Sequence, residues 1–174
     1  SASLGGDKLY HSMFLNQAGF QFFALGNHEF DAGPSVTANF ISSASYTTFL
    51  SSNLDFSNHQ PMYDLFSNYR IVKSTLTDVS VGNSRIKVGL VGATTKNLNF
   101  ISSPSPVRVL SNIAGIVQDE VISLKSNGAE IVLLVSHLQG VSEELSLISE
   151  LDGIDVVIAG GGDNRLANPS DSLI

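Results

Sequence analysis

The sequence contains no cysteine, carries few charged side chains and has no long apolar run. The absence of cysteine excludes a disulfide framework and a thiolate metal site. No apolar run approaches about 20 residues, the length of a membrane-spanning helix, and no charged start followed by an apolar stretch indicates a signal peptide. The 9 basic residues are outnumbered by 16 acidic ones, which gives a net charge of −7. Because no cluster of Lys or Arg could follow a phosphate backbone, we expect no nucleic acid partner.

Apolar side chains, in contrast, are plentiful. They make up 43% of the 174 residues, which is enough to bury one good-sized core. The length is typical of one domain. We therefore expect residues 1–174 to form a single domain rather than a disordered chain.

Short apolar segments alternate with amphipathic ones along the chain. Helical spacing of the apolar residues predicts helices over 7–18, from Pro34 onward, over 107–127 and over 142–151. Runs of β-branched and apolar residues predict strands within 20–25, 46–56, 70–76, 85–95, 130–137 and 155–164. This alternation is typical of an α/β fold, with a mostly parallel or mixed sheet covered by helices on both faces.

Several boundaries of these segments have their own signals. Ser111 is a suitable N-cap for the helix predicted over 107–127, and Gly128 can end that helix in a left-handed conformation. Gly19 is a suitable stop for the first helix. Residues 52–70 resemble a polar, turn-rich loop.

Three of the predicted strands end in unusual polar residues, in "FALGNHEFD", "LLVSHLQG" and "VIAGGGDN". Ligand sites of open α/β sheets lie beyond the carboxyl ends of the strands. The three strand ends would thus bring Asn27, His28, His137 and Asp163 to one rim of the sheet. We predict the functional site at this rim.

The side chains at the rim are the mixed nitrogen and oxygen ligands that suit Mn²⁺, Zn²⁺, Fe or similar divalent ions. Asn27 could offer its amide oxygen, His137 a ring nitrogen and Asp163 a carboxylate. These donors are the ones that two-metal hydrolases use. The alternative for Gly160–Asp163 is a tight turn without a ligand.

The residues after Asn27 suggest acid–base chemistry. His28 would project toward a substrate and could protonate a leaving oxygen, while Glu29 or Asp31 could orient an imidazole. Against this stands the more common case, in which a histidine after a strand is a hydrogen-bonded structural residue. No phosphate-binding loop of the Gly-Lys-Ser/Thr type and no Gly-x-Ser-x-Gly elbow of a serine esterase is present.

Five segments in order, "ALGNHEFDAGP", "FLSSNLDF", "KVGLVGATT", "IVLLVSHLQG" and "DVVIAGGGDN", resemble the metallophosphoesterase domain of the 5′-nucleotidase family, in the calcineurin-like superfamily. The resemblance covers nearly the whole chain. It implies an α/β/β/α sandwich of mixed sheets and a site for two divalent metal ions. By this resemblance Asn27 and His137 are metal ligands, His28 is catalytic, and Glu29 and Asp31 support them from the second layer of the site.

The chain departs from the family pattern in two places. The family's first strand, with an Asp-x-His ligand pair and a following bridging Gly-Asp, is not found; Gly6-Asp7 is better explained as the start of a helix. Near the other end, Gly161 stands where the family has its first His of Gly-His-x-His, and Asp163 replaces the second. The resemblance therefore implies a domain that is incomplete at both ends, whose first metal site lacks a ligand.

Two hypotheses follow for function. In the first, the parent protein is a metal-dependent phosphoester hydrolase that releases phosphate from nucleoside 5′-monophosphates or similar phosphomonoesters, and its other parts supply the missing strands and a C-terminal domain. In the second, the chain is a non-catalytic binding or structural module, or an inactive fragment, with a degenerate metal site. Because such hydrolases are commonly exported, we expect a periplasmic, cell-surface or secreted location.

Overall fold

The computed structural model describes residues 3–162 of the chain. Its helices are α1 (Ser3–Ala18), α2 (Pro34–Ser43), α3 (Gln60–Ser67), α4 (Leu98–Ile101), α5 (Ile113–Ser126) and α6 (Val141–Ile148), with a 3₁₀ turn η1 (His28–Phe30). Its strands are β1 (Phe22–Ala24), β2 (Thr48–Leu50), β3 (Leu54–Asp55), β4 (Ile71–Val72), β5 (Ser74–Val81), β6 (Ser84–Thr94), β7 (Arg108–Val109), β8 (Ile131–His137) and β9 (Val156–Ala159).

Within these residues the strands form three sheets. The first is parallel throughout and has the order β1-β2-β4. The largest has the order β5-β6-β8-β9, in which β5 is antiparallel to β6 and the other three strands are parallel. A short antiparallel pair, β3 with β7, is the third. The β6–β8 register pairs Thr94 with His137, so these two residues end their strands side by side.

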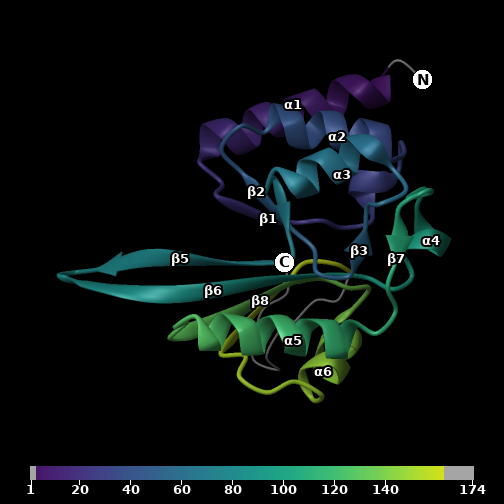
Figure 1. The fold of residues 1–174 in the computed structure, drawn as a ribbon. Coiled ribbons are helices and arrows are strands. Elements are labelled where there is room, and N and C mark those ends of the chain that lie inside the picture. Colours follow the sequence, from purple (N-terminus) through teal and green to yellow (C-terminus); the bar gives the residue numbers. More distant parts are fainter. Residues whose placement is uncertain (1–2, 163–174) are drawn as a thin grey trace, which may run out of the picture.

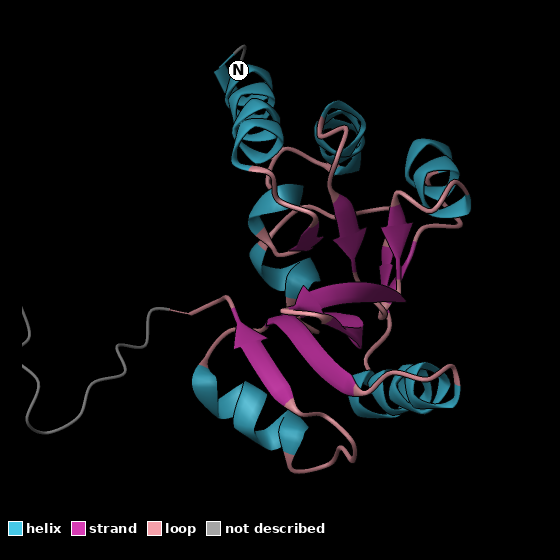
Figure 2. Ribbon diagram, turned by 90° about the vertical axis from the view of Figure 1, so that its left-hand side faces the viewer, coloured by secondary structure: helices cyan, strands magenta, loops and turns pink. Residues whose placement is uncertain are grey.

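Helices cover the two larger sheets on opposite sides of the molecule. α1, α2 and α3 lie against the β1-β2-β4 sheet, and α5 and α6 lie against the four-stranded sheet (Figures 1 and 2). Each helical layer has its own apolar core, one around Phe40 and Phe49 and the other around Val117 and Leu134. The order helix, sheet, sheet, helix confirms the predicted sandwich of mixed sheets.

A buried polar network joins the two larger sheets. The side-chain amide of Asn53 pairs with the backbone of Thr94 in both directions, each bond being 2.8 Å long. The Thr94 hydroxyl lies 2.8 Å from that of Ser51 and donates to the carbonyl of Leu25 at 2.7 Å. These buried side chains therefore fix the ends of β1, β2 and β6 relative to one another.

The segment 52–70 contains more structure than its sequence predicts. It holds β3 and the helix α3, where a polar loop was expected. Met62 is fully buried. The His59 ring accepts a hydrogen bond from the backbone N–H of Met62 at 3.4 Å and so caps the helix. The helix was missed because most of its other side chains face solvent and give the segment a polar composition.

Two predicted helix starts were also wrong. α5 begins at Ile113 and not near 107, because the chain first forms β7, and its N-cap is Asn112 rather than Ser111. α1 begins at Ser3, which places Gly6-Asp7 inside the helix. The helix ends were predicted correctly, since Gly19 and Gly128 have φ values of 72° and 92°. Of the helices in residues 3–162, none has the length and apolar character to cross a bilayer.

Candidate functional site

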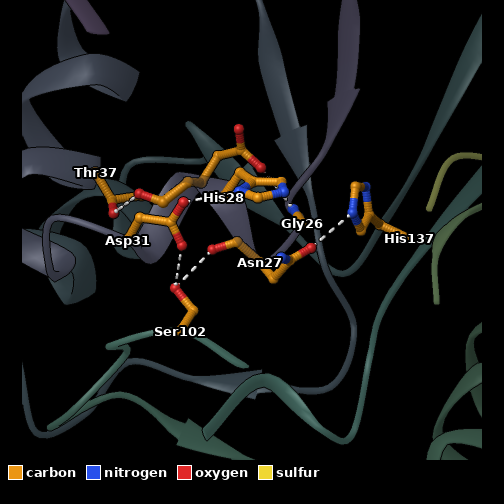
Figure 3. Close-up of polar contacts among 8 residues, drawn as sticks. Gly26, Asn27, His28, Asp31, Thr37, Ser102 and His137 are labelled. Atoms are coloured by element: carbon orange, nitrogen blue, oxygen red, sulfur yellow. Dashed lines mark hydrogen bonds and ion pairs between the residues drawn. The ribbon is translucent and has the colours of Figure 1, made fainter. Parts of the chain in front are cut away.

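Asn27 and His137 meet at the carboxyl ends of β1 and β8, although 110 residues separate them in the chain. His137 Nε2 lies 2.9 Å from Asn27 Oδ1 (Figure 3). Asn27 is 8% exposed and His137 is half-buried. Asn27 and His137 therefore lie together at the strand ends, as the sequence predicts.

The position of the His137 ring depends on a glycine. A Cβ atom at Gly26 would lie 2.5 Å from His137 Nδ1, so the ring packs directly on the backbone before Asn27. On the main-chain side, the carbonyl of His137 accepts a hydrogen bond from the N–H of Thr95 at 2.9 Å. The ring thus packs on the residues after β1, while the end of β6 holds the backbone of His137.

His28 and Asp31 form a polar pair beside Asn27. His28 Nδ1 lies 2.7 Å from Asp31 Oδ2, and their side chains are 75% and 45% exposed. The hydroxyl of Ser102, the residue after α4, lies 2.9 Å from the other Asp31 oxygen and 2.8 Å from the Asn27 carbonyl oxygen (Figure 3). The exposed His28 imidazole is therefore held by Asp31, which is in turn held by Ser102.

Glu29 stabilises the turn that carries these groups. Its carboxylate accepts a hydrogen bond from the N–H of Gly26 at 2.9 Å, and its carbonyl accepts one from the Thr37 hydroxyl at 2.6 Å. The Phe30 ring below it is completely buried. Glu29 thus links the end of β1 to α2 and sets the direction in which Asn27 and His28 leave the strand.

Burial lowers the pKa of His137 below its ordinary value of 6.5. The nearby carboxylates of Glu29 and Glu144 act in the opposite direction, and His28 adds to the lowering. Burial is the largest of these effects, so the His137 imidazole is neutral at pH 7. A neutral imidazole is the form that coordinates metal ions.

The pair Asn27 and His137 fits a divalent ion. His137 Nε2 and Asn27 Oδ1 are 2.9 Å apart and form a hydrogen bond. Two ligands at right angles on an octahedral ion, each about 2.1 Å from it, would have a similar spacing. The donor set, an imidazole nitrogen and an amide oxygen, suits Mn²⁺, Zn²⁺ or Fe. Among residues 3–162, however, no three His, Asp or Glu side chains are grouped as a metal site. Asn27 and His137 are therefore two candidate ligands and not a complete site among the described residues.

Gly161 cannot supply a ligand in this backbone. A Cβ atom there would lie 1.9 Å from the carbonyl oxygen of Leu138, and one at Gly162 would lie 2.6 Å from that of Gln139. The two loops after β8 and β9 thus pass each other at a distance that leaves no room for a side chain. Asp163, the third predicted ligand, lies outside the described residues.

Sequence reasoning missed two residues that shape the site. Ser102 has no sequence signal, because a serine after a short helix is unremarkable and its contacts with Asn27 and Asp31 are tertiary. Thr94 did carry a signal, since "GATT" ends a predicted strand just as "VSH" does. Applying the strand-end rule to β6 would have identified it.

Known proteins resemble the chain along most of its length, although no model of a protein family matches it. A 5′-nucleotidase of Diplobatis ommata is 33% identical over 148 residues, which cover 84% of this chain and 24% of that protein. A snake venom 5′-nucleotidase of Gloydius brevicauda is 28% identical over 147 residues, with the same coverage of 84% and 24%. The chain thus spans about a quarter of the length of these relatives.

Solved structures agree with these relatives. A 5′-nucleotidase precursor of Thermus thermophilus has a TM-score of 0.72 and 33% identity, over 86% of this chain and 27% of that one. The NAD nucleotidase of Haemophilus influenzae has a TM-score of 0.71 and 26% identity, over 91% and 26%. A calcineurin-like phosphoesterase of Bacillus subtilis shares the fold at 17% identity, with a TM-score of 0.65 over 87% and 46%. The chain therefore belongs to the 5′-nucleotidase family, and it shares its fold with a calcineurin-like phosphoesterase.

Proposed function

We propose that the protein containing this chain is a metal-dependent phosphoester hydrolase that releases phosphate from nucleoside 5′-monophosphates or similar phosphomonoesters. The observation that carries the proposal is the meeting of Asn27 and His137 at 2.9 Å, beside the exposed His28–Asp31 pair. Family membership supports it, since the relatives and neighbours in the comparison are named 5′-nucleotidases and an NAD nucleotidase. The sugar phosphate or base that is preferred would be selected by parts outside these residues.

Asn27 and His137 would hold one divalent ion, and Asp163 would serve a second. Divalent ions bound at such a centre polarise the phosphoryl oxygens and neutralise the charge that develops on them. This chain contributes the direction of the ligands: Gly26 lets the His137 ring approach, and the Thr94 network fixes the strand ends. The protein thus prepares a rigid pair of donors before any ion arrives.

His28 would act as the general acid. Asp31 accepts a hydrogen bond from Nδ1 at 2.7 Å, which leaves Nε2 as the ring nitrogen that would reach the substrate. As the phosphorus–oxygen bond to the leaving group breaks, a proton passes from His28 Nε2 to that oxygen, and Asp31 stabilises the imidazolium before the transfer. Ser102 keeps the Asp31 carboxylate in place through its other oxygen. Glu29 would take part only by holding the turn.

Further strands of the complete protein would pack next to β1. An apolar groove of about 810 Å³ lies along β1 and beside β8 and β9, with Phe22, Ala24 and Ile158 in its lining and His137 at its edge. β1 pairs only with β2 among the described strands, so its other edge can accept a strand. Relatives about four times as long have chain to fill such a groove.

We also propose an extracytoplasmic location, in line with a venom protein and a precursor among the similar proteins.

The second candidate function is a non-catalytic binding or structural module. The close approach of Gly161 to Leu138 favours it, because the backbone excludes a side-chain ligand at the position where the family has a histidine. A module of this kind needs neither two ions nor a general acid. This candidate function does not explain why the hydrogen-bonded pair of His28 and Asp31 is present.

The test uses the complete protein that contains these residues. We expect two equivalents of metal by elemental analysis after dialysis against Mn²⁺ or Zn²⁺, together with hydrolysis of p-nitrophenyl phosphate and AMP. His28→Ala should lower turnover by about 10²- to 10⁴-fold while metal content stays the same. His11→Ala is the matched control, since His11 is exposed on α1. A folded protein that binds no metal and hydrolyses neither ester would refute the hydrolase and support the module.

A further inference from the structure

Glu144 is a buried carboxylate that the proposed chemistry does not use. It lies in the first turn of α6 and is 3% exposed. An ionised side chain is among the costliest groups to remove from water, so its burial requires compensating contacts. Its neighbour Glu143 in the same turn is only partly buried. The burial of Glu144 is therefore specific to its position and does not follow from the helix it occupies.

The contacts of Glu144 flank His137. Its Oε1 atom accepts a hydrogen bond from the Ser136 hydroxyl and another from the Leu138 N–H, each 3.3 Å long. Ser136 is 2% exposed and Leu138 is 3% exposed, so both contacts are shielded from water. The carboxylate thus binds the residue before His137 and the residue after it. Neither contact goes to the free N–H groups of α6 itself, as an ordinary helix cap would.

The second oxygen of Glu144 adds to this picture. Oε2 is buried and has no hydrogen-bond partner within the part of the chain that the structure describes. A buried unpaired oxygen is unfavourable for stability and needs a functional or structural reason. Glu143, by comparison, accepts hydrogen bonds from Gln139 N and Asn97 Nδ2 at 3.4 and 3.5 Å, and neither partner is a residue directly next to His137 in the chain.

We infer that Glu144 is a positioning residue for His137. It anchors residues 136 and 138 so that the ring between them stays on Gly26 with Nε2 at Asn27. The carboxylate contributes negative charge behind the ring as well, but its role is the anchoring. The consequence for metal binding rests on the proposed function, in which His137 is a ligand, whereas the anchoring itself does not.

Amide hydrogen exchange of the metal-free protein tests the anchoring directly. Glu144→Ala should raise the exchange rate of the Leu138 amide by about tenfold or more and should shift the ring resonances of His137. Glu144→Gln should leave both close to wild type, because its amide oxygen can still accept the two hydrogen bonds. Glu143→Ala is the matched control and should leave the Leu138 amide unaffected. Unchanged Leu138 exchange in Glu144→Ala would overturn the inference whether or not the protein binds metal.

Metal affinity in the complete protein is the second test of the role of Glu144. We expect Glu144→Ala to weaken Mn²⁺ or Zn²⁺ binding by about 10- to 100-fold, the range found for residues that orient a ligand, and Glu144→Gln to restore it. Equal losses in both variants would show that charge and not anchoring is responsible, and would overturn the positioning role. If wild type binds no metal, the proposed function fails while the exchange experiment still decides on Glu144.

A smaller change guards against misfolding of Glu144→Ala. Ser136→Ala removes one of the two anchoring hydrogen bonds and only one oxygen atom. It should move the His137 resonances in the same direction and by a smaller amount. In the background of Glu144→Ala it should have no further effect, because its partner is already gone. Additive effects of the two substitutions would contradict the anchoring.

Discussion

Replacing Gly26 with alanine should disrupt the site through steric contact alone. Gly26 is not among the glycines with positive φ, so alanine can adopt its backbone conformation. The added Cβ atom would lie 2.5 Å from His137 Nδ1 and 2.6 Å from Cε1 and Cγ. Ordinary contacts of a Cβ atom begin near 3.4 Å. The ring must therefore move by roughly 1 Å, as carbon contacts at optimal separation are about 3.5–4.0 Å long.

This displacement can be converted into an expected loss of affinity. Overpacking of a well-packed region costs about 1–3 kcal/mol. If the ring relieves that strain by leaving its contact with Asn27, the same free energy must be supplied when a metal ion draws it back. Because about 1.4 kcal/mol corresponds to a factor of ten, binding should weaken by about 5- to 150-fold.

The assay is calorimetric titration of the complete protein with Mn²⁺ or Zn²⁺. Gly160→Ala is the matched control, since its Cβ atom would lie 4.0 Å from the same Nδ1 atom, which is an ordinary contact. We expect the control to bind metal as wild type does. Gly26→Ala with wild-type affinity, or a loss of the same size in Gly160→Ala, would refute the reasoning from the packing of His137.

Three further expectations concern other parts of the chain. Gly161→His should lower the free energy of unfolding by about 3 kcal/mol without adding bound metal, since its Cβ atom meets Leu138 O at 1.9 Å; more metal at an unchanged urea midpoint would contradict this. Tyr69→Gly should raise the free energy of unfolding by about 0.5–1 kcal/mol, because Tyr69 has φ 59° and is 79% exposed; urea denaturation measures it. Hydrogen bonds from Ser57, followed by Arg108, hold the pKa of Asp55 below 3.8. Its contribution to stability is thus present above pH 3.8 and lost as the pH falls through the lower native pKa, so Asp55→Asn should flatten the acid limb of a stability profile.

Much of the fold could be predicted because local signals and packing agree. The apolar faces of α5 and α6 follow directly from residue spacing, and the apolar run of β8 marks it as a strand of the sheet. The helix α3 was missed although Met62, Leu65 and Phe66 recur at helical spacing and pack on the core. The helix is short, and the polar and turn-forming residues around it in 52–70 concealed this pattern.

The site was predictable to the extent that strand ends determine it. The rule that ligands lie at the carboxyl ends of strands brought Asn27 and His137 together across 110 residues, as observed. It could not identify Ser102 or Glu144, because each acts through a hydrogen bond that exists only in the folded chain. The resemblance to the family, and not strand geometry, identified Gly161 as a position without the expected ligand. The structure adds that a Cβ atom there would lie 1.9 Å from Leu138 O.

The departure from the family pattern at residues 161–163 raises the question whether chemistry at the rim is lost. Asn27 and His137 are positioned by Gly26, by the end of β6 and by the anchor at Glu144, and none of these supports uses a side chain after β9. The His28–Asp31 pair has its own support in Ser102. In the proposed dinuclear centre, a change at residues 161–163 would therefore alter one half while the other half keeps its geometry. The proposed hydrolase would require that retained half, whereas a purely structural module would not.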